Sequence, residues 1–408
     1  MQIAFVTPEF ITDYPDGGGL GNYLNRIGKF LVDQGHQPEI FVSSDLEPRI
    51  LMLEGIRVER VPPFSRRLWA RILGRMFTVA GEHWRVLFSS FSRSLALAEA
   101  MERRHRKRPF DIVQSADYLA VGLAVRRAKG RVHLVRCSGA RDLYNKVDGC
   151  HHRAARWQER LERAAMRRAD KAYAPSEFVA EHFRARHRIP VEVLRPPVGL
   201  EVVPSAGRPC GLPERFFVHF GILRRSKGTH WLGESLKRVF EVEPSLRMVW
   251  VGRGDFTEVG TLLSGLGRHR SKVQVLYPLP KPELYGVLQH ADAAVLPSLV
   301  DNLPNTVIES LMMGIPVIGT RGASIDELVE HGVTGELVAP GDVEGLASTM
   351  VRVWRGQSSV RKGFAWRGGV VDEMQPERAI EKLLQMAGAR NSESNPLVEN
   401  ASSDNLRS

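Results

Sequence analysis

The sequence predicts two successive α/β domains, each built around a parallel sheet, and three observations lead to this fold class. The chain has 408 residues, which is about the length of two domains. Short apolar segments alternate with longer helical segments along most of the chain, as in βαβ units. This alternation is interrupted at Pro196-Pro197 and then starts again. We therefore expect a first domain over residues 1–197, a second over residues 198–374, and a hinge at the proline pair.

The first domain begins with a βαβ unit. A buried strand is expected at Gln2–Thr7, a helix over residues 20–33 after Gly17-Gly18-Gly19, and a second strand at Pro38–Ser43. The same alternation continues to the end of this domain. Its later strands are expected at Ile112–Ser115, Val132–Arg136, Lys171–Ala174 and Glu192–Pro197.

The second domain repeats this pattern with five apolar segments that are separated by helical stretches. Its strands are expected at Phe216–Phe220, Arg247–Val251, Val273–Tyr277, Ala293–Pro297 and Pro316–Gly319. A last helix at about residues 375–388 is expected to pack back on the first domain. Residues 391–408 are rich in Ser and Asn and have few large apolar side chains, which predicts a disordered tail.

The chain carries a formal net charge of +11, and a basic surface attracts phosphates, nucleic acid or anionic lipid. The excess lies mainly in the first domain, over residues 62–109 and 153–171. In Pro62–Pro109, arginines alternate with large apolar side chains. Two interpretations of this segment stay open. It forms an amphipathic helix on a membrane surface, or a pair of helices whose apolar faces pack on the first domain.

Composition argues against several other classes of protein. No segment approaches the roughly 20 uncharged apolar residues of a membrane-spanning helix. Cys137, Cys150 and Cys210 have no paired short spacing, which argues against a disulfide framework or a zinc site. The sequence has no acids of the Asp-x-Asp type and no His/Cys ligand spacing, so no metal cofactor is expected. We expect a cytoplasmic protein that is soluble or peripheral on the inner face of a membrane.

The segment with the most chemical content is Leu296–Gly319. A strand is expected to end at Pro297, and the following loop carries Asp301. Pro304 suits the first turn of a helix, because its missing N–H leaves no hydrogen bond unmade there, and Gly314 ends that helix. This order places the start of the helix above the strand ends.

Such a helix start has free backbone amides, here at Asn305 and Thr306, and the helix dipole makes them an anion site. Glu309 lies more than a turn deeper, where its carboxylate could accept hydrogen bonds from ribose hydroxyls. Asp301 is placed to hold the hydroxyls of a sugar beyond a diphosphate. From the residues alone, a capped helix with ordinary surface acids is an equal alternative.

This segment resembles the E-x7-E signature of the retaining glycosyltransferases of family 4, group 1, with Asp301 and Glu309 as the two acids. Gly314–Gly319 resembles the family's next turn and strand, and Gly332–Val338 resembles its glycine-bracketed hairpin. Matching pieces extend from Met1 to about Ala387. The resemblance implies the GT-B fold, in which two Rossmann-like domains face a central cleft, with acceptor on the first domain and nucleotide-sugar on the second.

The resemblance also implies roles for individual residues. Lys227 in the Gly221–Gly228 segment would bind the donor diphosphate, and Asp301 would contact the donor sugar. The family commonly has arginine where this sequence has Ile222, so Arg224 is the candidate for a second cation. The implied catalytic set is Asp301, Lys227 and Arg224. The implied donor-binding set is Gly18, Gly19, Gly221, Lys227, Asn302, Leu303, Pro304, Asn305, Thr306 and Glu309.

The acceptor side departs from the family pattern. Many members have a histidine where the strand that resembles Val132–Arg136 ends, and this sequence has Arg136-Cys137-Ser138 there. We expect Arg136 or Ser138 to face the sugar instead. Asp117 is a further candidate for acceptor hydroxyls, with a loop cap as its equal alternative. His133 is expected to be packed inside its strand, and nothing nearby marks Cys137 as a nucleophile.

The predicted activity is transfer of a sugar from a nucleoside diphosphate to an acceptor hydroxyl with retention of configuration. The expected partners are a nucleotide-sugar donor, a sugar or lipid-linked acceptor from polysaccharide, lipopolysaccharide or glycolipid assembly, and an anionic membrane surface along residues 62–109, but no nucleic acid. Two alternatives stay open. One is a sugar-nucleotide epimerase of the same fold, and the other is a non-catalytic basic protein that binds polyanions or lipid.

Overall fold

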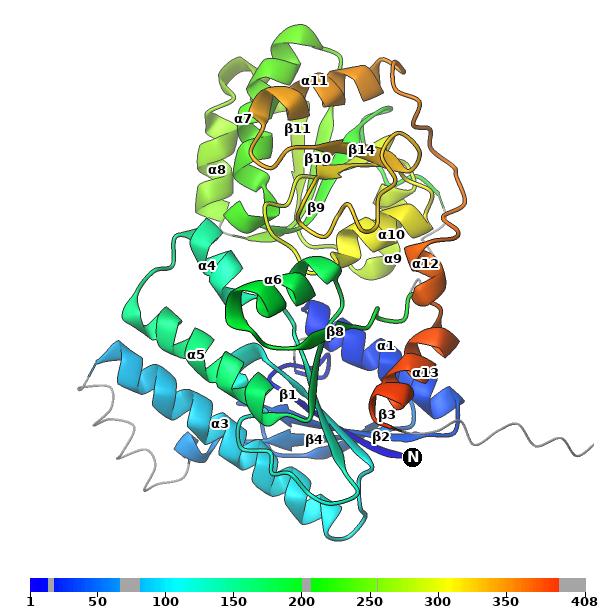
Figure 1. The fold of residues 1–408 in the computed structure, drawn as a ribbon. Helices are drawn as coiled ribbons and strands as arrows, with labels where there is room; N and C mark the ends of the chain where they lie inside the picture. Colours follow the sequence, from blue (N-terminus) through cyan, green and yellow to red (C-terminus); the bar gives the residue numbers. More distant parts are fainter. Residues whose placement is uncertain (14–17, 67–80, 200–206, 255, 389–408) are drawn as a thin grey trace, which may run out of the picture.

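The computed structural model describes residues 1–13, 18–66, 81–199, 207–254 and 256–388 (Figure 1). It has two α/β domains, one above the other in Figure 1, and each is built on its own sheet. The predicted fold class is confirmed. The predicted tail at 391–408 lies outside the described residues.

The first sheet has the strand order β3-β4-β2-β1-β5-β6-β7-β8, and every neighbouring pair is parallel except β3 and β4. The strands are β1 (Gln2–Thr7), β2 (Gln37–Ser43), β3 (Ile50–Leu53), β4 (Ile56–Val61), β5 (Ile112–Ala116), β6 (Val132–Arg136), β7 (Lys171–Ala174) and β8 (Val191–Val193). The helices are α1 (Gly19–Asp33), α3 (Glu82–His105), α4 (Arg141–Asp148), α5 (Arg153–Arg168) and α6 (Glu177–His187).

The second sheet has the order β11-β10-β9-β12-β13-β14, and all its neighbours are parallel. The strands are β9 (Phe217–Leu223), β10 (Met248–Gly254), β11 (Val273–Leu276), β12 (Ala293–Leu296), β13 (Val317–Thr320) and β14 (Gly335–Val338). The helices are α7 (Thr229–Val242), α8 (Phe256–Ser264), α9 (Lys281–Leu288), α10 (Asn305–Met312), α11 (Val343–Trp354) and α12 (Val370–Glu373).

Two features of the sheets differ from the predictions. The β3–β4 hairpin at the edge of the first sheet was not expected, because its strands are short and Glu54-Gly55 is a weak turn signal. The predicted hairpin at 332–338 is wrong. Its second half is β14, which lies parallel to β13, and Gly335 approaches Val317 so closely that an added Cβ would lie 2.1 Å from the Val317 carbonyl oxygen.

The chain returns to the first domain after the second. Helix α13 (Pro376–Met386) packs beside α1, and Ile380, Leu383 and Met386 are part of the apolar core that also contains β1 and β2 (Figure 1). The contacts arise because the apolar residues of α13 recur at helical spacing on one face. The first domain is therefore made of two separate stretches of sequence.

Part of the basic segment 62–109 lies outside the described residues, namely 67–80. Its last part is α3, which packs small side chains such as Ala96 and Ala100 into the core of the first domain. The same helix leaves Trp84, Phe91 and Leu95 exposed. Within the described ranges, no helix is long and apolar enough to cross a bilayer.

Candidate active site

A cavity of about 690 Å³ lies between the two domains and is lined by residues from both. Its walls are the loops that follow β1, β5 and β6 of the first sheet and β9, β10, β11 and β12 of the second. In open α/β sheets, ligands bind beyond the carboxyl ends of the strands. All the sequence-predicted site residues line this cavity.

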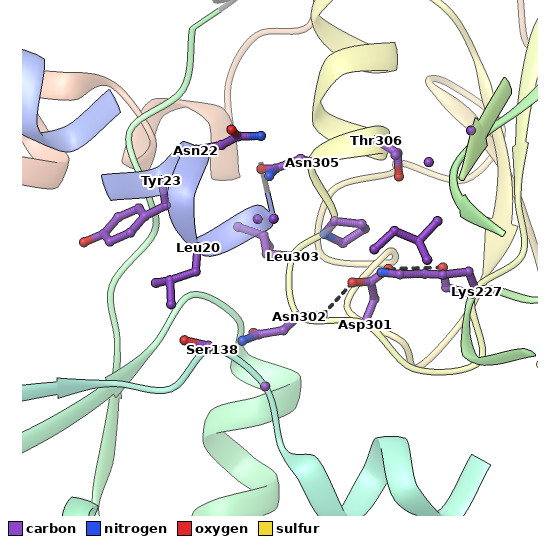
Figure 2. A pocket seen from close by; sticks show the side chains of 18 of the residues that line it. Leu20, Asn22, Tyr23, Ser138, Lys227, Asp301, Asn302, Leu303, Asn305 and Thr306 are labelled. Carbon is purple, nitrogen blue, oxygen red and sulfur yellow. Dashed lines mark hydrogen bonds and ion pairs between the residues drawn. The ribbon is translucent and has the colours of Figure 1, made fainter. Parts of the chain in front are cut away.

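Two helix N-termini face each other across the cleft. Gly19 begins α1 in the first domain and Asn305 begins α10 in the second, and a Cβ added at Gly19 would lie 3.6 Å from Nδ2 of Asn305 (Figure 2). Gly18 lies against Glu9, whose carboxylate accepts hydrogen bonds from the first amides of α1. Opposed helix starts of this kind concentrate positive potential between them.

The start of α10 fits closely against β9. Pro304 precedes the first helical residue, so the proline is the N-cap and not, as predicted, a residue of the first turn. Gly221 has φ +111°, and an added Cβ would lie 3.0 Å from Cγ2 of Thr306. Leu303 also has a positive φ of 57°, which is rare for a residue with a side chain, and its N–H donates to Oγ of Ser324 at 2.8 Å. These contacts fix the backbone conformation at the start of α10.

Lys227 and Asp301 are in direct contact at the floor of the cleft (Figure 2). Lys227 donates from Nζ to Oδ2 of Asp301 at 2.6 Å, and Oγ of Ser298 donates to the same oxygen at 3.1 Å. The backbone N–H of Asn302 donates to Oδ1 at 2.9 Å. Asp301 is 5% exposed. The ammonium and the two hydrogen bonds give this buried carboxylate the partners that replace water.

Glu309 also has a basic partner. It lies on the second turn of α10 and forms an ion pair with Lys281, the first residue of α9. The ammonium of Lys281 is in turn near the ring of Tyr285, 5.4 Å from its centroid. Both acids of the signature are therefore paired with lysines that come from other elements of the second domain.

Asn302 joins the second domain to the first. Its Nδ2 donates to the carbonyl oxygen of Cys137 at 2.9 Å, and its Oδ1 accepts from Oγ of Ser176 at 2.8 Å. A second connection is made by Glu327, which accepts the first two amides of α6, those of Glu177 and Phe178, at 2.8 Å each. These bonds hold the domains together over the cleft.

Arg224 lies at the cleft but makes a different contact from Lys227. Its guanidinium is 5.5 Å from the ring centroid of Tyr144, which is on α4 of the first domain. Ile222, at the position where the family commonly has arginine, is 40% exposed and lines the same cavity. An aliphatic side chain there cannot bind a phosphate. Arg224 is the arginine of this loop that lines the cavity.

The first-domain wall contains Asp117, Arg136 and Ser138. Asp117 accepts the N–H of Ser138 at 2.7 Å. Burial, followed by repulsion from the carboxylate of Glu162, raises the pKa of Asp117 to about 7. Arg136 lies over the ring of Tyr23, with the guanidinium carbon 4.1 Å from the centroid.

His133, which was predicted to be packed inside its strand, and Cys137, which was not expected to be a nucleophile, are both buried. His133 is 2% exposed, bonds Oγ of Ser115 through Nε2 at 2.9 Å, and has a pKa lowered to about 4 by burial. Cys137 is fully buried, which raises the pKa of its thiol well above the ordinary value. A buried neutral thiol is a poor nucleophile.

Comparison with known families decides the assignment. A family described as Glycosyltransferase Family 4 matches residues 17–202, and one described as Glycosyl transferases group 1 matches residues 214–355. The two matches cover the two domains in the order that the fold places them. The chain belongs to the group 1 glycosyltransferases of family 4.

Its curated relatives in this family are distant. The amylovoran biosynthesis glycosyltransferase AmsK of Erwinia amylovora is 33% identical over 87 residues, 20% of this chain and 21% of the relative. The N-acetyl-alpha-D-glucosaminyl L-malate synthase of Bacillus anthracis is 26% identical over 41% of this chain and 44% of the relative. The matches to these relatives thus span less than half of each protein. A longer match is to the D-inositol 3-phosphate glycosyltransferase of Actinosynnema mirum, 25% identical over 83% of this chain and 84% of the relative.

Solved structures of glycosyltransferases share the fold over nearly the whole chain. The sucrose-phosphate synthase of Thermosynechococcus elongatus has a TM-score of 0.70 at 18% identity, with 95% of this chain and 97% of that chain covered. Anabaena HepE, solved with UDP and glucose, has a TM-score of 0.65 at 17% identity, with 96% of this chain and all of the other covered. This glycosyltransferase therefore has the GT-B fold.

Several cleft residues of this glycosyltransferase were missed by the sequence analysis. Lys281 follows β11, Glu9 follows β1, and Tyr144 and Glu162 come from α4 and α5. Lys281 and Glu9 could have been found by taking every charged residue within a few positions of a strand's carboxyl end. Tyr144 and Glu162 carry no such signal, because only the packing of helices brings them to the cleft.

The fold also assembles a cluster that no spacing in the sequence indicates. Nε2 of His182 and Nε2 of His187 each lie 2.9 Å from Oδ2 of Asp142, and the three ligand atoms could hold a metal ion. The cluster ties α4 to α6, and none of its residues lines the 690 Å³ cavity.

Proposed function

We propose that this glycosyltransferase moves a sugar from a nucleoside diphosphate to an acceptor hydroxyl with retention of anomeric configuration. The observation that carries the proposal is the convergence of two helix N-termini and Lys227 on one cavity. Backbone amides and a lysine are what a diphosphate requires, since each oxygen needs a donor or a positive charge. The neighbouring structure solved with UDP and glucose supports a donor of this class.

The proposed donor lies against the second domain. The amides of Asn305 and Thr306 bind one phosphate, Gly221 lets the backbone approach it, and Lys227 and Arg224 balance its charge. Gly18 and Gly19 contact the diphosphate from the first domain. Glu309 accepts the ribose hydroxyls, and Asp301 the hydroxyls of the donor sugar. Asn302, Leu303 and Pro304 hold the loop that aligns these groups.

Catalysis in this proposal consists of positioning and charge stabilisation. The leaving diphosphate takes the proton of the acceptor hydroxyl on the same face of the sugar, which keeps the anomeric configuration. Lys227 and Arg224 stabilise the charge that develops on the leaving group, an effect that is largest in a site from which water is excluded. No metal cofactor is required, because lysine, arginine and helix amides supply the positive charge. Activity should therefore persist in a chelator.

The acceptor is proposed to be a sugar or lipid-linked sugar in the assembly of a polysaccharide, lipopolysaccharide or glycolipid, on the cytoplasmic side of a membrane. Exposed Trp84, Phe91 and Leu95 on α3, in a basic stretch of sequence, support contact with an anionic membrane surface. Vesicles of anionic and of zwitterionic lipid test this contact by sedimentation. Retention of the protein by neither kind would refute the membrane part of the proposal alone.

The central experiment measures nucleotide binding and product configuration. UDP, GDP and ADP are compared by thermal unfolding, since a ligand that binds only the folded state raises the melting temperature. The sugar nucleotides of the base that binds are then screened for enzyme-dependent release of diphosphate, and the product anomer is assigned by NMR. Failure of all three nucleotides to bind refutes the proposal, and an inverted product refutes retention. A changed sugar nucleotide in the absence of acceptor would identify an epimerase instead.

Variants of the two acids test their separate roles. Glu309→Gln should weaken nucleotide binding, whereas Asp301→Asn should leave it within about twofold and reduce transfer by at least about tenfold. Glu330→Ala is the control, because Glu330 is an exposed acid of the same domain. Equal effects of both variants on nucleotide binding would show that the roles are not divided in this way.

A further inference from the structure

Three of the cations that line the cleft form an ion pair with a carboxylate, and Arg136 and Arg224 differ from them in this respect. The ion pairs are Lys227 with Asp301, Lys281 with Glu309, and Arg141 with Glu162. A guanidinium or ammonium that leaves water needs such a partner, because desolvation of an unpaired charge is costly.

Arg136 and Arg224 lack such a partner. Within the part of the chain that the structure describes, neither has a carboxylate at salt-bridge distance, and each lies over a tyrosine ring instead, Tyr23 and Tyr144 respectively. Arg136 is the more deeply buried, at 7% exposed. It lines the cavity from the end of β6, on the first-domain wall.

The ring of Tyr23, over which Arg136 lies, is held by its buried neighbours. The hydroxyl of Tyr23 lies 3.0 Å from that of Tyr173 and 3.2 Å from Oε1 of Gln114, and Tyr173 donates to the same Oε1 at 2.7 Å. All three side chains are buried. A buried ring whose hydroxyl is hydrogen-bonded in this group cannot move to follow the arginine, so the guanidinium is held over it at the wall of the cavity.

Asp117 is an acid on the same wall, and among the described residues it is not within salt-bridge distance of Arg136. Its carboxylate accepts the N–H of Ser138, and the charged groups around it are those of Glu162, Arg136 and Arg141. Burial opposes its ionisation, so that its pKa is about 7. The acid is therefore partly protonated near neutral pH, and the positive charge of Arg136 remains available to a ligand.

We propose that Arg136 binds a second anionic group, distinct from the donor diphosphate, on one of the two sugars. The inference rests on the proposed transfer function and adds to it the chemical class of a substrate. The donor diphosphate accounts for Arg224, which shares its loop with Lys227 on the second domain. Arg136 lies on the opposite wall, where a carboxylate or a phosphate monoester would complete a two-pronged hydrogen bond with the guanidinium.

Two sources supply this chemistry. A uronic acid in the donor places a carboxylate on the transferred sugar, and a phosphorylated or carboxylated acceptor places the anion on the sugar that receives it. Both would give Arg136 the same bidentate partner, and they differ in which substrate fails to bind when the arginine is removed.

The test is calorimetric titration of the full chain saturated with the nucleoside diphosphate that it binds best. Glucose, glucose 6-phosphate and glucuronate are the acceptor-side probes. For the donor side, binding of the uridine diphosphate derivatives of glucose and glucuronic acid is compared. At least one anionic probe should bind about tenfold or more tightly than its neutral counterpart, since hydrogen bonds between charged groups are worth at least that factor.

Arg136→Met keeps an unbranched side chain next to Tyr23 and removes the charge. We expect it to abolish the preference for the anionic probe while the affinity for the nucleoside diphosphate stays within about twofold. Arg136→Lys should retain part of the preference. The control is Arg103→Met, an exposed arginine on α3 that changes the net charge equally. Circular dichroism and thermal unfolding establish that each variant is folded, and Arg136→Lys carries the test if the methionine variant is not.

Each outcome either supports or overturns the inference. An anionic preference that disappears in Arg136→Met supports it, and the arm that shows the preference identifies the source. Equal binding of anionic and neutral probes by the wild type overturns it. A loss of nucleoside diphosphate binding in Arg136→Met also overturns it, because Arg136 would then be a diphosphate ligand. If no nucleoside diphosphate binds the wild type, the proposed function fails first.

Discussion

Lys227 and Asp301 contact each other, with Nζ 2.6 Å from Oδ2. The family resemblance implies a different ligand for each, the donor diphosphate for Lys227 and the donor sugar for Asp301. Lysine and aspartate come from segments that are 74 residues apart in the chain. Each neutralises the other while the cleft holds no donor. A bound donor has to share or replace this ion pair, with the diphosphate taking over the ammonium and a sugar hydroxyl taking over the carboxylate.

The ion pair leads to the first prediction. Lys227→Met should lower the free energy of unfolding by about 1–3 kcal/mol, because it leaves the buried carboxylate of Asp301 without its cation. Adding Asp301→Asn in the same chain should restore most of the loss. Urea unfolding of the two single variants and the double variant forms a double-mutant cycle. Strictly additive effects would mean that the two side chains do not stabilise one another.

The turn that carries Lys227 gives a second prediction. Gly228 has φ +76°, and an added Cβ would lie 1.9 Å from the carbonyl oxygen of Pro297. Gly228→Ala should therefore lower the free energy of unfolding by roughly 2–5 kcal/mol through steric overlap and backbone strain.

Gly267→Ala is the matched control for this substitution. Gly267 also has a positive φ, of 53°, but no atom lies within 4 Å of its added Cβ. Gly267→Ala should therefore lower the free energy of unfolding only by the cost of the left-handed backbone conformation, about 1–2 kcal/mol. Urea unfolding measures both variants. A similar loss at both positions would attribute the effect to backbone conformation alone and not to the contact with Pro297.

The third prediction concerns the connection between the domains. Glu327→Ala removes the acceptor for the first amides of α6 and the 2.6 Å partner of Arg195. We expect amide exchange at Glu177 and Phe178 to accelerate by at least about tenfold, and the radius of gyration to increase as the domains separate more often. Hydrogen exchange and small-angle scattering measure the two effects. Unchanged exchange in Glu327→Ala, with Glu330→Ala as the control, would rule out this connection.

The fourth prediction is a dependence of stability on pH. His219 is fully buried between the carbonyl oxygen of Val295 and Oγ1 of Thr229, and burial lowers its pKa to about 4. Between pH 6.5 and 4 the unfolded chain binds a proton that the folded protein does not, so stability falls as the pH falls through this window. The loss is at most about 1.4 kcal/mol per pH unit for this group.

A substitution isolates the contribution of His219 from groups of opposite sign such as Asp117. His219→Asn removes the titrating group, so the stability of the wild type relative to this variant should shrink as the pH is lowered from 7 to 5. Urea unfolding at each pH measures the difference. A difference that stays constant over this range would show that His219 does not titrate as its burial indicates.

The sequence predicts the fold well because the signals are local. Apolar strands such as Gln2–Thr7 and Lys171–Ala174 are buried on both faces, so their continuous hydrophobic runs identify them with the bounds that the structure has. The edge strands β3 and β14 lack this signal. One is half exposed, and the other is positioned by the close approach of Gly335 to β13.

The sequence predicts which residues line the site, but it does not predict which residues they contact. A motif places Asp301 and Glu309 on a strand-loop-helix unit, and this unit folds as expected. Their ion pairs with Lys227 and Lys281, and the ring contacts of Arg136 and Arg224, depend on packing between elements that are distant in sequence. Spacing along the sequence cannot predict these contacts, because they depend on how the helices pack against the sheets.

Helix α13 has a consequence for how the protein is made. Ile380, Leu383 and Met386 belong to the core of the first domain, although the whole second domain lies between them and the rest of that core. During synthesis from the N-terminus, the face of α1 that α13 covers stays open to solvent until α13 leaves the ribosome. An exposed apolar face of this kind is a natural binding site for a chaperone. The core of the first domain is therefore completed only after the second domain has been synthesised.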